Sequence, residues 1–119
     1  MTTITVCTTC RNAVNRDTQK GAPTGEDFLD LVRERAEGSG IAVRGVACLM
    51  GCNHGCNVAI SDTGKMTYVL GRFDGTEADA AALTDYARQH ANSASGTVPF
   101  RQWPQGVKGH FVARVPPLD

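Results

Sequence analysis

The sequence predicts an α/β domain with a small mixed sheet, two main helices and an irregular C-terminal tail. Apolar and polar residues alternate around Ile4 and Val6, as in a short strand. Two later segments carry apolar residues at helical spacing, and a turn at Gly64 separates two apolar runs that suit a hairpin. The chain has 119 residues, of which 41% are hydrophobic, and this is enough for one compact core.

The first predicted strand ends at Cys7, which places that cysteine at the junction between a strand and a loop. Residues 11–25 show no apolar periodicity and are rich in Asn, Asp, Thr, Gly and Pro, which indicates a loop. This loop is basic, with three cationic residues against Asp17: Arg11, Arg16 and Lys20.

A helix is predicted after this loop, where Thr24 can cap it and Asp27 completes a capping box. Its apolar face consists of Phe28, Leu29, Val32 and Ala36. Gly38 and Gly40 end the helix, and the apolar residues of 41–46 then predict a second strand that leads into the second cysteine group.

Residues 57–60 and 66–70 flank the turn and predict the two strands of the hairpin. Asp74 or Thr76 then caps a second helix. Four of its residues fall on one face: Leu83, Tyr86, Ala87 and His90.

From Asn92 onward, Ser, Gly and Pro interrupt any regular pattern, and one short strand is expected at 111–115. We therefore expect a domain over residues 1–91 and a tail over 92–119 that packs on the same domain, with Trp103 as part of that packing.

Composition excludes several classes of function. The chain has 12 basic and 12 acidic residues, so no global field favours nucleic acid or an anionic membrane surface. No signal-peptide pattern and no apolar run of about 20 residues occurs, so we expect a cytoplasmic protein that does not enter a membrane. In that compartment thiols stay reduced, and an odd count of five cysteines indicates metal or redox chemistry.

The five cysteines form two tight groups, which both follow predicted strands. The first is Cys7 and Cys10, and the second is Cys48, Cys52 and Cys56. Thiolates are soft ligands that suit iron-sulfur clusters and zinc, and four of them complete a first shell for either. The C-x3-C-x3-C spacing departs from the two C-x-x-C knuckles of zinc ribbons, so an iron-sulfur centre is favoured, zinc is the alternative, and a dithiol oxidoreductase comes third.

The second group lies in a glycine-rich segment in which no Asp, Glu, Lys or Arg occurs between Gly45 and Ser61. A segment without charged residues favours a partly dehydrated site. Removing an anionic cluster from water opposes its further reduction. Arg11, Arg16 and Arg44 could offset part of that penalty. We expect His54 to face solvent in this segment.

One part of the sequence resembles a known family. Cys48-Leu-Met-Gly-Cys52-Asn-His-Gly, followed by Val58-Ala-Ile-Ser, a glycine turn and Met66-Thr-Tyr68, resembles the second cysteine loop and hairpin of the thioredoxin-like 2Fe-2S ferredoxins. This resemblance implies a thioredoxin-like fold and matches Cys48 and Cys52 to the second ligand pair and Cys7 to the first ligand. Cys10 follows Cys7 more closely than is usual in that family, and Cys56 stands where those ferredoxins often carry proline.

Over nearly its full length, tail included, the chain looks like a small bacterial family of predicted metal-binding proteins. Its members include ferredoxin-like proteins associated with cobalamin biosynthesis. The resemblance implies a homodimer and a link to cobalamin or cobalt metabolism.

These observations together predict an electron carrier that is not an enzyme. It would hold one iron-sulfur cluster on Cys7, Cys10, Cys48 and Cys52, with Cys56 as the extra thiol. We expect a 2Fe-2S cluster, and a 4Fe-4S cluster on Cys10 and the second group is the alternative. The basic residues of the first loop would orient an acidic face of a redox protein partner.

Overall fold

The structure is a computed structural model that describes residues 2–8, 25–46, 57–73 and 76–117. Within these ranges, neither of the two α-helices is long and apolar enough to span a membrane. In chain order the elements are β1 (Thr3–Cys7), α1 (Gly25–Ala36), β2 (Ala42–Val46), β3 (Val58–Ser61), β4 (Thr67–Leu70), α2 (Glu77–Asn92), the 3₁₀ helices η2 (Phe100–Gln102) and η3 (Gln105–Val107), and β5 (Phe111–Val115).

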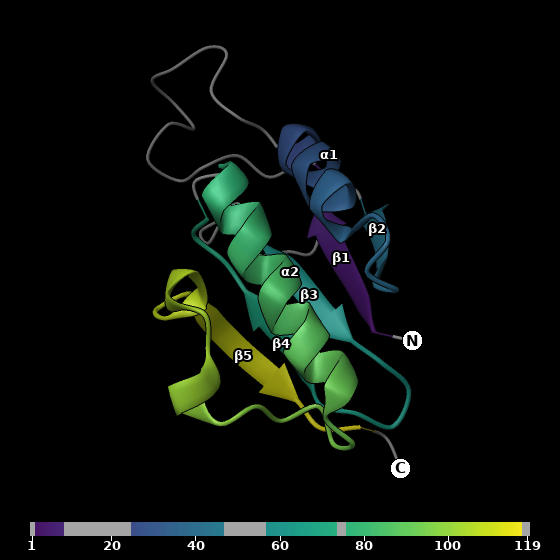
Figure 1. The fold of residues 1–119 in the computed structure, drawn as a ribbon, viewed down its shortest axis with the longest axis vertical. Coiled ribbons are helices and arrows are strands. Elements are labelled where there is room, and N and C mark those ends of the chain that lie inside the picture. The colour runs from purple at the N-terminus through teal and green to yellow at the C-terminus, as the bar shows by residue number, and fades with distance from the viewer. Residues whose placement is uncertain (1, 9–24, 47–56, 74–75, 118–119) are drawn as a thin grey trace.

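The five strands form one mixed sheet in the order β2-β1-β3-β4-β5 (Figure 1). β1 and β2 run parallel, and the other neighbouring strands run antiparallel. A parallel pair requires a crossover connection, which contains α1. Both α1 and α2 cover the same face of the sheet (Figure 1). The fold is therefore a small thioredoxin-like α/β fold, as the sequence predicts.

The residues of β1 alternate between the two faces of the sheet. Val6 is fully buried, and its register partner is Gly45 of β2. A Cβ atom on Gly45 would lie 2.7 Å from a methyl group of Leu29 in α1, so this face of the sheet packs against the helices. Because successive side chains of a strand point to opposite faces, Thr5 and Cys7 belong to the face that α1 and α2 do not cover.

Helix α1 combines a buried apolar stripe with charges that suit its dipole. Its first turn carries Glu26 and Asp27, and its last turn carries Arg33 and Arg35. The four predicted core residues are all buried: Phe28, Leu29, Val32 and Ala36. Two glycines beyond the helix have positive φ angles, 77° at Gly38 and 81° at Gly40, which confirms their predicted role at its end. The predicted cap Thr24 lies outside the described residues.

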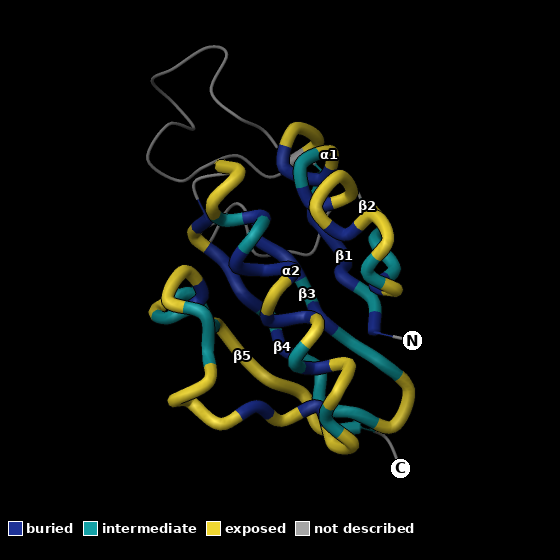
Figure 2. Tube along the Cα trace, viewed as in Figure 1, coloured by how far each residue is buried: buried dark blue, intermediate teal, exposed yellow. Residues whose placement is uncertain are grey.

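The hairpin and the second helix also follow the prediction. β3 and β4 pair antiparallel across a turn that contains Gly64, whose φ is 74°. Of the two predicted caps of α2, the Thr76 hydroxyl accepts a hydrogen bond from the backbone N–H of Asp79 at 3.2 Å, and Asp74 lies outside the described residues. The predicted apolar face is fully buried (Figure 2): Leu83, Tyr86, Ala87 and His90.

The tail returns along α2 and adds the edge strand β5 to β4, at the residues predicted for a strand. Before that strand, the Trp103 ring packs on Phe111 with 4.3 Å between ring centroids. Its indole N–H donates to the Val98 carbonyl at 2.8 Å. In the tail, as far as it is described, Trp103 thus packs against β5.

Candidate functional site

Cys7 is the member of the predicted ligand set that the structure describes. It is the last residue of β1 and is fully buried. Its backbone N–H donates to the carbonyl of Asn57 at 3.1 Å. The thiol therefore lies at a rigid strand end and is shielded from water, which suits a soft metal ligand.

The residues on either side of segment 47–56 are both bonded to the end of β1. On one side, Val46 is the register partner of Cys7, and its carbonyl accepts the Thr8 N–H at 2.8 Å and the Thr8 hydroxyl at 3.3 Å. On the other side, the Asn57 carbonyl accepts the Cys7 N–H. The segment that carries three cysteines thus begins and ends beside the first cysteine.

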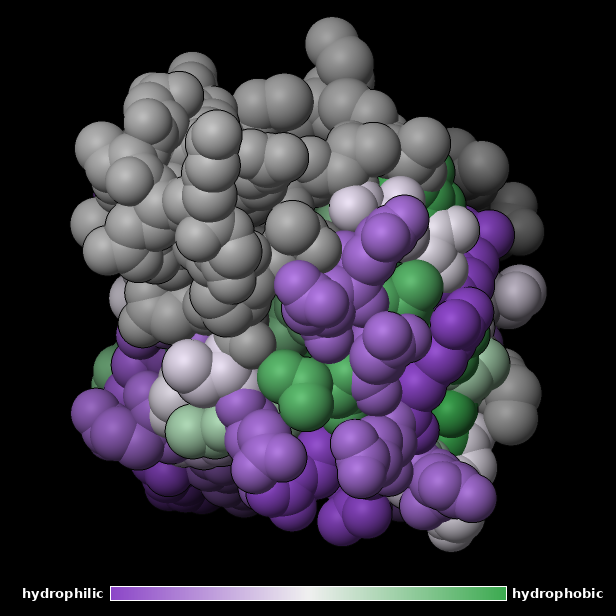
Figure 3. Space-filling view, turned by 90° about the horizontal axis from the view of Figure 1, so that it is seen from above, coloured by the Kyte–Doolittle hydropathy of each residue, from purple (hydrophilic) through white to green (hydrophobic). Residues whose placement is uncertain are grey.

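Both helices begin at this end of the sheet. In Figure 1 the chain rises along β1 and then descends along α1, and α2 likewise starts at the upper end. Viewed from above, hydrophilic side chains of the described residues surround a small hydrophobic patch at this end (Figure 3). The N-terminus of a helix is the positive end of its dipole, and here acidic side chains of the first turns already offset it, Glu26 and Asp27 in α1 and Glu77 and Asp79 in α2.

Arg44 adds a cation to the sheet face to which Cys7 belongs. It is the register partner of Thr5, and its Nε–H donates to the Thr5 hydroxyl at 2.8 Å. Thr5 and Cys7 point to the same face because they are two residues apart in one strand. Arg44 is an exposed residue, and its guanidinium group has further N–H groups besides the one bonded to Thr5.

The other predicted ligands lie outside the described residues: Cys10, Cys48, Cys52 and Cys56. The same holds for His54 and for the basic loop residues Arg11, Arg16 and Lys20. Within the described ranges, no three His, Cys, Asp or Glu side chains gather in a way that could hold a metal ion.

A comparison with family models identifies the chain. Residues 4–117 match the family described as "Protein of unknown function (DUF1636)". The chain belongs to the DUF1636 family. Comparisons with curated proteins and with solved structures gave no match. The match to DUF1636 extends over both cysteine groups and the tail, so the family relationship includes the whole of the candidate site.

Sequence reasoning missed a buried polar cluster at the opposite end of the sheet in this DUF1636 protein. The fully buried ring of His90 donates from Nε2 to the Met66 carbonyl at 2.8 Å, and its Nδ1 lies 2.9 Å from the Thr2 hydroxyl. Burial lowers the pKa of His90, although the bond to Met66 opposes this. The position of His90 on the apolar face of α2 predicts its burial, whereas its partners are distant in sequence, Thr2 just before β1 and Met66 just before β4.

His110, the second histidine of the described region, packs against the turn that follows β4. His110 stacks on Phe73, with ring centroids 4.3 Å apart and planes 6° apart. Its Nδ1 lies 2.8 Å from the Gly71 carbonyl, and the Gly71 N–H donates to the His110 carbonyl at 2.8 Å. These contacts tie the start of β5 to the end of β4, and they give His110 a structural role.

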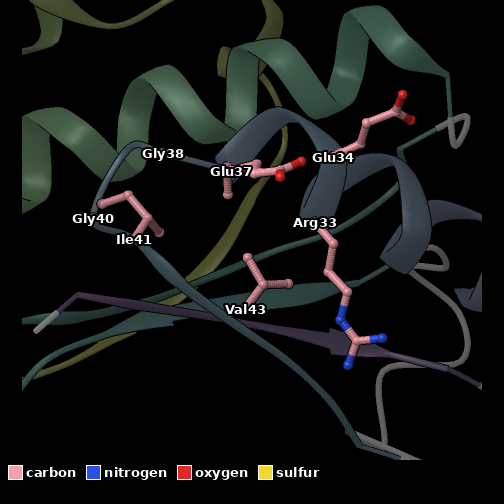
Figure 4. A pocket seen from close by; sticks show the side chains of 8 residues that line it. Arg33, Glu34, Glu37, Gly38, Gly40, Ile41 and Val43 are labelled. Carbon is pink, nitrogen blue, oxygen red and sulfur yellow. The ribbon is translucent and has the colours of Figure 1, made fainter.

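A hollow of about 470 Å³ lies between the end of α1 and β2 (Figure 4). Its charged residues Arg33, Glu34 and Glu37 are all exposed, and Arg33 extends past Val43. No buried titratable group lines this hollow, so its chemistry is that of an ordinary solvated surface.

Proposed function

We propose that this DUF1636 protein is a one-electron carrier that holds an iron-sulfur cluster of the 2Fe-2S type. Cys7, Cys10, Cys48 and Cys52 would hold the cluster, and the bound cluster would supply reversible one-electron redox chemistry. A redox protein would give or take the electron, and the chain itself would bind no substrate for this purpose.

The observation that carries the proposal is the attachment of both ends of segment 47–56 to the end of β1. Cys48 is two residues beyond Val46, so covalent geometry keeps their Cα atoms within about 7.6 Å of each other. Cys10 is three residues beyond Cys7, which limits their Cα separation to about 11 Å. Cys48 and Cys10 are therefore tethered close to the end of β1, and Cys52, five residues before Asn57, lies within about 19 Å of that residue. These limits are compatible with one first shell shared by the four thiols.

The surroundings of Cys7 also fit an anionic sulfur-ligated centre. Such a centre is stabilised by nearby positive potential. Arg44 lies on the same sheet face and is anchored by its bond to Thr5. The buried position of Cys7 excludes water from one side of the site. These features would hold a cluster in place and moderate its reduction potential.

The first experiment is purification of the full chain without oxygen, followed by visible spectroscopy and by iron, sulfide and zinc analysis. We expect brown protein with about two iron atoms and two acid-labile sulfides per chain. Colourless protein that contains zinc alone, and that forms no cluster after anaerobic reconstitution, would contradict the proposal and favour a zinc-binding or metal-handling protein.

The ligand set is tested by single Cys→Ser variants. Cys7→Ser, Cys10→Ser, Cys48→Ser and Cys52→Ser should each lose the visible absorption, whereas the matched control Cys56→Ser should retain it. Far-UV circular dichroism of each variant separates loss of the cluster from loss of the fold. If Cys56→Ser loses the cluster and Cys10→Ser keeps it, the cluster is retained as the function and the ligand set is wrong.

A further inference from the structure

A cleft of about 340 Å³ lies where the returning tail meets β5. In Figure 1 the tail descends from α2, turns and runs back beside β5 before entering it. Residues of β4, the tail and β5 line the cleft: Tyr68, Thr97, Val98, Trp103, Phe111, Val112, Ala113 and Arg114. Its volume falls in the range of about 300–1,000 Å³ that is typical of small-molecule sites.

Aromatic rings dominate the walls of this cleft and are held in fixed positions. Trp103 packs on Phe111 at 4.3 Å with 32° between the ring planes, and Tyr68 meets Phe111 edge-on at 5.6 Å. The hydrogen bond from the indole N–H to the Val98 carbonyl fixes the orientation of Trp103. The cleft is thus preformed and presents flat apolar surfaces, which suit a planar ligand.

Arg114 is the charged residue among those that line the cleft, and the charged residues of the described tail are all cationic. No Asp or Glu occurs between Ser93 and Pro117, whereas this stretch contains three cations: Arg101, Lys108 and Arg114. Arg114 lines the cleft itself, opposite Tyr68 in the register of β4 and β5. A ligand in the cleft would therefore gain from one negative charge near Arg114.

The aromatic walls of the cleft are backed by Tyr86. Tyr86 is fully buried, and its ring packs edge-on against Tyr68, Trp103 and Phe111 at 5.3–6.2 Å. Burial and the neighbouring phenol of Tyr68 raise the pKa of Tyr86, so the hydroxyl keeps its proton.

We propose that this cleft binds a planar aromatic ligand that carries a single negative charge, of the class of an aromatic carboxylate. The ligand ring would lie against the aromatic walls, and its carboxylate would pair with Arg114. A protein partner is less well matched, since a stable interface requires about 800 Å² on each side and this surface is a small concave cleft. The proposal is independent of the metal centre, because no cysteine contributes to it.

The test uses the indole N–H of Trp103, the one tryptophan in the chain, as a reporter in ¹H–¹⁵N NMR. The probes are 2-naphthoate and its neutral isostere 2-naphthamide, each titrated into the full chain. We expect both to shift the indole signal and naphthoate to bind about fivefold more tightly, as one partly exposed ion pair allows. Equal affinities for the two probes, or an indole signal that neither probe moves, would overturn the proposal.

Arg114→Gln should remove the preference for naphthoate and leave the affinity for naphthamide unchanged, so naphthamide also reports whether the variant retains the cleft. Arg101→Gln is the matched control, because it removes the same charge from the same tail outside the cleft. If both variants weaken naphthoate binding equally, the effect comes from the overall positive charge of the tail, and the proposed binding site is wrong. An indole shift with protein concentration alone would show that a second copy of the chain fills the cleft.

Discussion

Arg72 is the one described non-glycine residue with a positive φ angle, 62°, and replacing it with glycine should stabilise the protein. The left-handed conformation costs a non-glycine residue about 1–2 kcal/mol. Its neighbours prevent relaxation, because Gly71 is bonded to His110 and the buried Phe73 stacks on the same histidine. Glycine loses about 0.5–1 kcal/mol more backbone entropy on folding, so the net gain of Arg72→Gly is about 0.5–1 kcal/mol.

At this chain length the entropy of unfolding is about 0.25 kcal/mol/K, so the gain corresponds to about 2–4 °C in Tm. Thermal unfolding followed by far-UV circular dichroism measures it. Arg72→Ala is the control, because it removes the guanidinium group and keeps the Cβ atom that causes the strain. If Arg72→Gly is no more stable than Arg72→Ala, the positive φ at this position costs no measurable free energy and the prediction is wrong.

Two further predictions concern regions distant from the cysteines. Because burial lowers the pKa of His90, the unfolded chain takes up a proton first, and stability should fall as the pH drops below about 6.5, by at most about 1.4 kcal/mol per pH unit. Urea unfolding between pH 7.5 and 5 in wild type and His90→Gln checks this, and an equal slope in both would contradict it. Gly106→Ala should destabilise the protein by about 1–3 kcal/mol, since its Cβ would lie 2.6 Å from that of Ala82. Gln105→Ala, in the same 3₁₀ helix, is the control in thermal unfolding and should change little.

Local patterns predict most of the fold, because they report on local geometry. The alternation around Val6, the apolar stripe from Phe28 to Ala36 and the turn at Gly64 each match the element that forms there. Thr76 caps α2 as its side-chain chemistry predicts. Even the strand after the irregular tail begins and ends at the expected residues, Phe111 and Val115. In each case the sequence pattern lies within a few residues of the element that it predicts.

Local sequence patterns do not predict contacts between segments that are distant in the sequence. Nothing near His90 in the sequence indicates that its ring meets Thr2, 88 positions away. The positive φ of Arg72 follows Gly71, whose bonds go to His110, a residue 39 positions away just before β5. Gly106 must be small because α2 approaches it, and the helix is far away in the sequence. These features follow from the packing of whole elements, which one sequence does not specify.

For the candidate site, the sequence predicts that the two cysteine groups follow neighbouring strands. The structure confirms that the two strands are neighbours. β1 and β2 are parallel neighbours, and Cys7 lies opposite Val46. The sequence does not indicate that Asn57 also returns to Cys7, since that bond requires β3 to pair with the other side of β1. The assignment of four thiols to one cluster remains a proposal about Cys10, Cys48 and Cys52.

Equal numbers of acidic and basic residues suggest that the protein has no net electrostatic field. At short range, however, the charges are unevenly distributed over the fold. Between Gly25 and Glu37 the sequence has five acidic and two basic residues, whereas the stretch from Ser93 to Pro117 has three basic residues and no acidic one. These two regions lie on opposite sides of a molecule 42 Å long (Figure 1). At 0.1 M salt, charges are screened beyond about 10 Å, so an approaching molecule experiences one region at a time. Zero net charge therefore excludes a long-range field, while an anionic molecule is still attracted to the tail and repelled by α1.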